Sequence, residues 1–222
     1  MAVVFDALTD YGISHNSVTS FTDTRHTVGS GSNRALIVAL SAEATLPTAP
    51  TCNWDSAGTN QSMTAIASIA RSTSTKTWLF CLVAPTSGAK TLNVASLGTA
   101  ADVIVAYISF TGADQTGGTT TFKNAISSTA TETTNTKTVT TVSGDGVVGM
   151  FSGNDGTPTV NQTAWTSAAV TTASIDFHIG NFAIAAGATT VMSMTQTSAP
   201  DTGVALAINQ AVIDVLQAQI ML

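Results

Sequence analysis

The sequence has very few of the side chains that carry most protein chemistry. Of 222 residues, 7 are Lys or Arg, 3 are His and 2 are Cys, and charged residues make up 9% of the chain. Acid–base catalysis, nucleophile activation and metal binding all need titratable groups gathered in one place. The composition therefore favours a protein that is not an enzyme and holds no cofactor or metal.

Clusters of basic residues are missing as well. The seven cations are scattered, the formal net charge is −6 and the pI is 4.6. Nucleic-acid surfaces need grouped Lys and Arg, and anionic membrane surfaces attract the same groups. No apolar run reaches the roughly 18 residues of a transmembrane helix, and the N-terminus lacks the features of a secretory signal. We expect no nucleic-acid or membrane partner, and first release into the cytosol.

Hydroxyl and apolar residues fill the chain instead. Ser and Thr account for 62 residues, and hydrophobic residues for 44%. Short segments rich in Val, Ile, Thr and Phe recur between Gly, Asn, Asp and Pro, which is typical of strands. Leu36–Leu40 and Trp78–Val83 are continuous apolar runs, as expected for strands buried on both faces. Many short strands without crossover helices predict an all-β protein, an antiparallel β-sandwich with a jelly-roll-like topology.

One domain is expected over residues 1–210, followed by a short C-terminal arm over 211–222. The Thr-rich stretch 127–138 is the closest to a linker, although it also fits a surface loop or a solvated strand. The arm has apolar residues at helical spacing, but a β arm is also compatible. Its apolar surface needs cover, either from its own domain or from a neighbouring protein, and we favour a neighbour. The predicted interface contacts are Val212, Ile213, Val215, Leu216, Ile220, Met221 and Leu222.

Several pieces follow one another in a characteristic order. They are Thr27–Arg34 leading into Ala35–Leu40, Trp78–Val83 before Ala84-Pro85, Val105–Gln115, Gly144–Val148 and Gly203–Ile208. In this order they resemble a β-sandwich module of phage virion proteins, which is also seen in bacterial surface proteins. The resemblance covers Val18 to Asn209 and implies a structural or adhesive module without catalytic residues. The chain departs from the pattern in its reduced basic and aromatic content at the sandwich edges and in its apolar tail.

The resemblance implies a virion structural protein of a tailed phage, in first place a capsid decoration (cement) protein. Its partners would be the major capsid protein or other virion proteins, and it would be assembled into the virion in the host cytoplasm. A homo-oligomer is expected, with a trimer favoured. The alternatives are a tail or baseplate component, or a carbohydrate-binding or host-adhesion module with Trp165 as the ligand-stacking residue.

Other candidate sites have simpler interpretations. Histidines and aspartates that are neighbours in sequence suggest a His/carboxylate metal site, but no second group of ligands with suitable spacing completes it. These residues are His15, His26 and His178, with Asp10, Asp23 and Asp176. A weaker Ca²⁺ hypothesis concerns aspartates next to turns, a position that Asp also favours for backbone reasons. They are Asp55, Asp114, Asp145, Asp155 and Asp201.

The remaining residues that could suggest a site are predicted to be structural. Cys52 and Cys81 are expected to be buried free thiols, with a disulfide as the alternative. Trp78 and Tyr107 are expected in the core. The segment Gly29–Asn33 is a predicted β-turn, since a phosphate-binding loop needs a following helix and a Lys.

Overall fold

The regular structure of the described chain is almost entirely β-strand. The structure, a computed structural model, describes residues 1–43, 50–70, 75–98, 101–130, 133–153, 158–164, 177–197 and 201–212. These residues contain a single 3₁₀ turn, η1 (Gly118–Thr121), and no α-helix. No helix in the described ranges is long and apolar enough to cross a membrane. The predicted all-β class is confirmed.

The strands form two consecutive groups, which we call the first and second modules. The first module contains β1 (Val4–Val18), β2 (Phe21–Asp23), β3 (Thr27–Val28), β4 (Ala35–Glu43), β5 (Thr51–Trp54), β6 (Gln61–Ser62), β7 (Thr64–Ala70), β8 (Thr75–Val83), β9 (Gly88–Ala89), β10 (Leu92–Ala95) and β11 (Ala101–Thr111). The second contains β12 (Phe122–Ala130), β13 (Thr134–Thr140), β14 (Gly146–Gly153), β15 (Thr159–Val160), β16 (Thr163–Ala164), β17 (Phe177–Ile184), β18 (Thr189–Thr195) and β19 (Asp201–Ile208).

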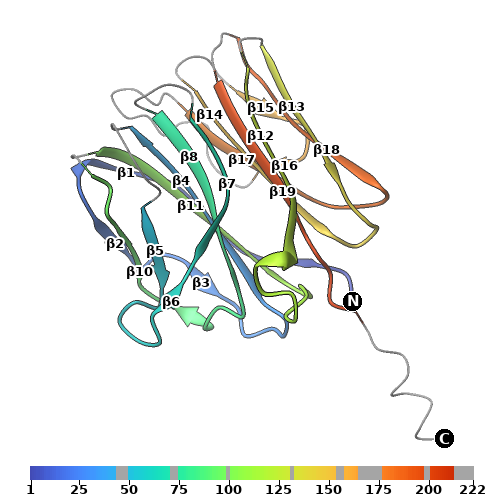
Figure 1. Cartoon of the computed structure of the whole chain (residues 1–222), viewed down its shortest axis with the longest axis horizontal. Helices are drawn as coiled ribbons and strands as arrows, with labels where there is room; N and C mark the ends of the chain where they lie inside the picture. Colours follow the sequence, from blue (N-terminus) through green and yellow to red (C-terminus); the bar gives the residue numbers. More distant parts are fainter. Residues whose placement is uncertain are drawn as a thin grey trace, which may run out of the picture.

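Each module is a sandwich of two antiparallel sheets. In the first, the sheet β1-β11-β4-β8-β7 faces β2-β10-β5-β6, and β3 pairs with β9. In the second, β12-β19-β14-β17-β16 faces β13-β18-β15. The two five-stranded sheets also pack against each other, so the molecule is a stack of four layers (Figure 1). The predicted antiparallel β-sandwich is confirmed, and residues 1–210 comprise two such sandwiches.

The two modules share one topology. When the strands of the second module are numbered in chain order, its sheets run 1-8-3-6-5 and 2-7-4. The first module shows the same two orders once the two-residue strands β3, β6 and β9 are set aside. Successive strands that alternate between two facing sheets in this way form a jelly roll. The chain is therefore a tandem of two jelly-roll-like sandwiches.

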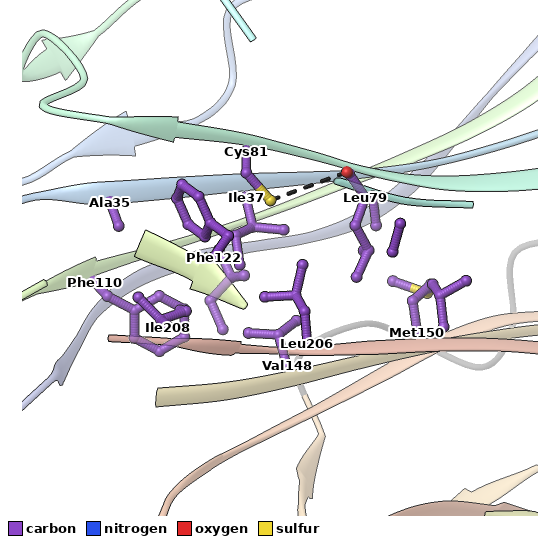
Figure 2. Packing of buried hydrophobic residues seen from close by; sticks show 14 of the residues in the cluster. Ala35, Ile37, Leu79, Cys81, Phe110, Phe122, Val148, Met150, Leu206 and Ile208 are labelled. Atoms are coloured by element: carbon purple, nitrogen blue, oxygen red, sulfur yellow. Dashed lines mark hydrogen bonds between the residues drawn. The ribbon is translucent and has the colours of Figure 1, made fainter. Parts of the chain in front are cut away.

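Three hydrophobic cores separate the four layers. The central core lies between the five-stranded sheets and contains Ile37 of β4, Val148 of β14 and Leu206 of β19, all fully buried (Figure 2). β4 also contributes Leu36 to the outer core of its own module. Every residue of β14 is buried as well. The double burial predicted for Leu36–Leu40 is confirmed, and that predicted for Trp78–Val83 holds as far as Cys81, since Leu82 and Val83 are only partly buried. For β14 the sequence predicts a strand over Gly146–Ser152 without indicating burial on both faces.

Strand positions differ from the sequence prediction in a few places. The sequence predicts a first strand over Val3–Leu8, whereas β1 continues to Val18 through three shifts of register. β15 and β16 are too short to leave a recognisable pattern. The Thr-rich stretch 127–138 contains the end of β12 and most of β13, which identifies the described part of this stretch as strand.

Buried hydroxyl groups bridge the two modules through the central core. Thr77 Oγ1 lies 2.8 Å from Ser41 Oγ in its own sheet and 2.8 Å from Ser152 Oγ in the facing sheet. Ser152 Oγ in turn lies 2.9 Å from Thr202 Oγ1. All four side chains are buried, so their hydrogen bonds satisfy groups that water does not reach.

Truncation in the central core should destabilise the whole chain. We expect Leu206→Ala to lower the free energy of unfolding by about 2–5 kcal/mol, because it removes a fully buried side chain that both modules share. Urea unfolding followed by circular dichroism measures the loss. Thr138→Val, on an exposed position of β13, is the control and should change stability by less than about 0.5 kcal/mol. Equal losses for both variants would contradict a shared core.

Candidate functional site

Exposed apolar side chains gather at one place on the described surface. The exposed large hydrophobic residues of the described chain are Met1, Val4, Phe5, Leu8, Val142, Ile184, Val191 and Val212. All except Val191 lie at the start of the chain, beside the turn before β14, at the end of β17, or at the end of the described chain.

Backbone hydrogen bonds join these segments at a place that we call the terminal junction (residues 1–3, 142–145, 184–185 and 210–212). The Met1 amino group donates to the Ala211 carbonyl at 2.5 Å. The Val3 amide donates to the Gly144 carbonyl at 2.8 Å, and the Gly144 amide donates to the Ala185 carbonyl at 2.8 Å. The start of the first module therefore meets the end of the second.

The last described residues are anchored before they leave the body. The Gln210 side-chain amide donates to the Ser143 carbonyl at 2.7 Å, and the Gln210 backbone amide donates to Asp145 Oδ1 at 3.3 Å. The Ala211 amide donates to the Gly112 carbonyl at 2.7 Å. Gly112 has a φ of +74°, and an added Cβ would collide with the Ala2 carbonyl, so this close approach requires glycine.

An ion pair between the buried Asp145 and the partly exposed Lys123 holds the turn at the centre of the junction. Asp145 is fully buried, and its Oδ2 lies 3.1 Å from Lys123 Nζ. The same oxygen accepts a hydrogen bond from the Val142 amide at 2.9 Å. Because removal of either charge would leave the other uncompensated, this pair fixes the turn to β12 and to the C-terminal segment.

Beside the junction lies an apolar surface shared by the two modules. Phe5 of β1 stacks on Phe182 of β17, with ring centroids 5.0 Å apart. Ile184 lies two residues after Phe182 and therefore on the same face of β17. Leu8 is paired with Ile108, a residue of the central core. We define the junction patch as the exposed side chains Met1, Phe5, Leu8, Val142, Ile184 and Val212.

Only the first of the predicted arm residues falls within the described part of the chain. Val212 is 88% exposed, which places the start of the apolar segment outside the folded body. The other predicted interface residues, Ile213, Val215, Leu216, Ile220, Met221 and Leu222, lie outside the described residues, and so does Trp165. The sequence missed Phe5, Leu8 and Ile184, since their strand pattern does not reveal which strand lies at an edge.

A second group of polar side chains lies inside the first module. Tyr107 donates to Asp23 Oδ2 at 2.5 Å, and Arg25 Nε donates to Asp23 Oδ1 at 2.9 Å. Burial raises the pKa of Asp23, but the hydrogen bonds from Tyr107 and Arg25 outweigh it and lower this pKa overall. Burial, followed by the charge of Asp23, raises the pKa of Tyr107. Asp23 is therefore ionised and bonded within the fold.

The histidines whose side chains are described are buried. The His26 ring stacks on Tyr107 with centroids 5.4 Å apart, and its Nδ1 lies 2.9 Å from Thr9 Oγ1. Burial lowers the pKa of His26 to about 4 and that of His178 to about 3. Both rings are neutral near pH 7, and they lie on different modules.

The metal hypotheses find no joint site among the residues that the structure describes. No three His, Cys, Asp or Glu side chains in these ranges lie close enough to hold an ion. Asp55 accepts hydrogen bonds from Thr59, and Asp114 from Thr116, within their own turns. The side chains of His15, Asp10 and Asp201, as well as Asp155 and Asp176, lie outside the described set.

The predicted core residues are where the sequence placed them. Cys52 and Cys81 are buried free thiols, and burial raises the pKa of both. Trp78 and Tyr107 are buried in the outer core of the first module.

Stability should fall in mild acid because of the buried histidines. The unfolded chain binds protons at His26 below about pH 6.5, whereas the folded chain does so only near pH 4. The free energy of unfolding should therefore decrease between these values, by about 3 kcal/mol for His26 alone. Urea unfolding across this range should show a shallower pH dependence for His26→Gln than for the parent chain. An unchanged dependence would contradict the assignment.

Comparison with known proteins adds no relative. No protein-family model matches the chain, and no curated protein sequence matches it. The fold is that of an all-β protein with several antiparallel sheets, and its function must be argued from its surface.

Proposed function

We propose that this chain is a non-enzymatic structural protein of a tailed-phage virion that binds other proteins through its terminal junction. The observation that carries the proposal is the junction patch, which contains six of the eight large hydrophobic side chains exposed in the described part of the chain, on segments that meet near the start of an apolar segment. Exposed apolar side chains grouped in this way are typical of protein interaction sites. A capsid decoration protein is the role that the resemblance favours, ahead of a tail or baseplate component.

The chemistry of the junction patch supports a protein partner. Its side chains are aliphatic, aromatic or thioether groups, and none of them carries a charge. The buried centres of protein interfaces are depleted of charged residues and enriched in Phe and Met. The Met1 amino group and the Asp145 carboxylate, which lie nearby, are each paired inside the junction.

The outer sheet of the second module supports close protein contact as well. β13 exposes Thr134, Thr136, Thr138 and Thr140, while its Lys137 points inward and is buried. The facing positions of β18 are Thr or Ser, apart from Val191. An uncharged outer face lets a chain of net charge −6 approach another acidic protein without local repulsion. Weak contacts of this kind become effective when a symmetric shell repeats them.

Removal of the apolar segment tests the proposal directly. A chain that lacks residues 212–222 should remain folded by circular dichroism, because the deleted residues follow the last anchored residue, Ala211. It should bind phage particles that lack this protein at least about tenfold more weakly than the intact chain, in a co-sedimentation assay.

A matched pair of point variants separates the junction patch from general surface effects. Ile184 and Val191 are both β-branched and both 42% exposed, but only Ile184 lies in the patch. Ile184→Ser should weaken particle binding, and Val191→Ser should leave it unchanged. Full binding by both Ile184→Ser and the truncated chain would overturn the proposal.

A further inference from the structure

We propose that the junction patch binds the C-terminal segment, residues 213–222, of a second copy of this chain, so that copies exchange arms and form a closed oligomer. The inference rests on the proposed function, because both place a protein contact at the terminal junction. It goes further by naming the partner that occupies the patch.

The accepting surface lies along an edge strand. β1 is the outermost strand of its sheet, and Phe5 and Leu8 project from it towards the second module. Ile184 of β17 extends the same surface across the boundary between the modules. An edge strand beside an apolar surface suits an extended apolar segment, which can add main-chain hydrogen bonds to side-chain burial.

The composition of the donated segment matches this surface. Residues 213–222 read IDVLQAQIML, with a single charged residue, Asp214. In an extended conformation they would span about 33 Å, more than enough to follow the part of β1 between Phe5 and Leu8. Both surfaces are apolar, so each would remove the other from water.

The start of the segment favours a neighbour over the segment's own body. Gln210 and Ala211 are held by hydrogen bonds to Asp145, Gly112 and Met1, and Val212 is already 88% exposed. The chain there is Ala211-Val212-Ile213, and the two β-branched residues before Asp214 favour extended backbone that continues away from the anchored Ala211.

The position of the donor favours a closed assembly. The exit point at Val212 lies at the same junction as the accepting patch. Hydrogen bonds from Met1 to Ala211 and from Val3 to Gly144 hold the two together. Copies that surround an axis at this junction can each donate one arm and accept one. A donor and an acceptor on opposite ends of the molecule would instead build an open filament.

The absence of charge on the junction patch is compatible with self-association of an acidic chain. Each copy carries a net charge of −6, so two copies repel one another wherever charged faces meet. The junction patch has no charged side chain. The arm contains one charged residue, Asp214. Because Asp214 is close to the exit point at Val212, its side chain can remain in solvent at the rim of the proposed interface.

Light scattering coupled to size exclusion measures the proposed oligomer without any phage particle. The intact chain should form one closed species of defined mass, and a chain lacking residues 213–222 should be a monomer. Ile184→Ser and Leu8→Ser should each weaken self-association about tenfold, and Val191→Ser should not. Circular dichroism of each variant verifies that the fold is retained.

A mixing experiment identifies the donor and the acceptor. The truncated chain keeps an intact patch, and Ile184→Ser keeps an intact arm, so a mixture should form mixed oligomers detectable by native mass spectrometry. The truncated chain alone should form no oligomers. A monomeric intact chain, an open filament, or full association of the truncated chain would each overturn the inference.

The two proposals can fail separately. An oligomer that does not bind particles would overturn the virion function and leave arm exchange standing. A monomer that binds particles through its junction would overturn arm exchange and leave the virion function standing.

Discussion

The fold depends on burial of the central core between the two five-stranded sheets. β4 and β14 are buried on both faces, so each contributes apolar side chains to its own sandwich and to the other module. A module alone would expose residues such as Ile37 or Leu206 to water, at a cost of about 1.5–3 kcal/mol for each side chain. The four-layer stack removes this surface, much as a symmetric dimer interface does, but within one chain.

The same packing creates the candidate site. The two five-stranded sheets face each other in opposite strand order, so β7 lies against β12 at one edge and β1 approaches β17 at the other. The stacked Phe5 and Phe182 rings lie at this second edge. The N-terminus and the last described residues also meet near this edge, because the Met1 amino group donates a hydrogen bond to the Ala211 carbonyl. The junction patch therefore follows from the way in which the modules stack.

The few ionisable groups of the chain that the structure describes serve mainly to hold segments in place. Asp23 binds Tyr107 and Arg25, and Asp145 binds Lys123 and the backbone around it. Groups bonded in this way stabilise turns and edges of the sandwich, because a buried carboxylate must be paired.

The sequence alone determined the all-β class, most of the longer strands and the burial of the two cysteines. These properties depend on local periodicity and composition, as in β4, where an unbroken apolar run requires cover on both faces. Tertiary structure alone decided that β14 is covered equally, that Lys137 points inward, and that Phe5 and Ile184 lie at an edge. The reason is that a strand's pattern specifies two alternating faces, while the partner of each face and the place of the strand in its sheet depend on contacts distant in sequence. The second jelly roll remained hidden for the same reason, since its topology exists only in strand pairing.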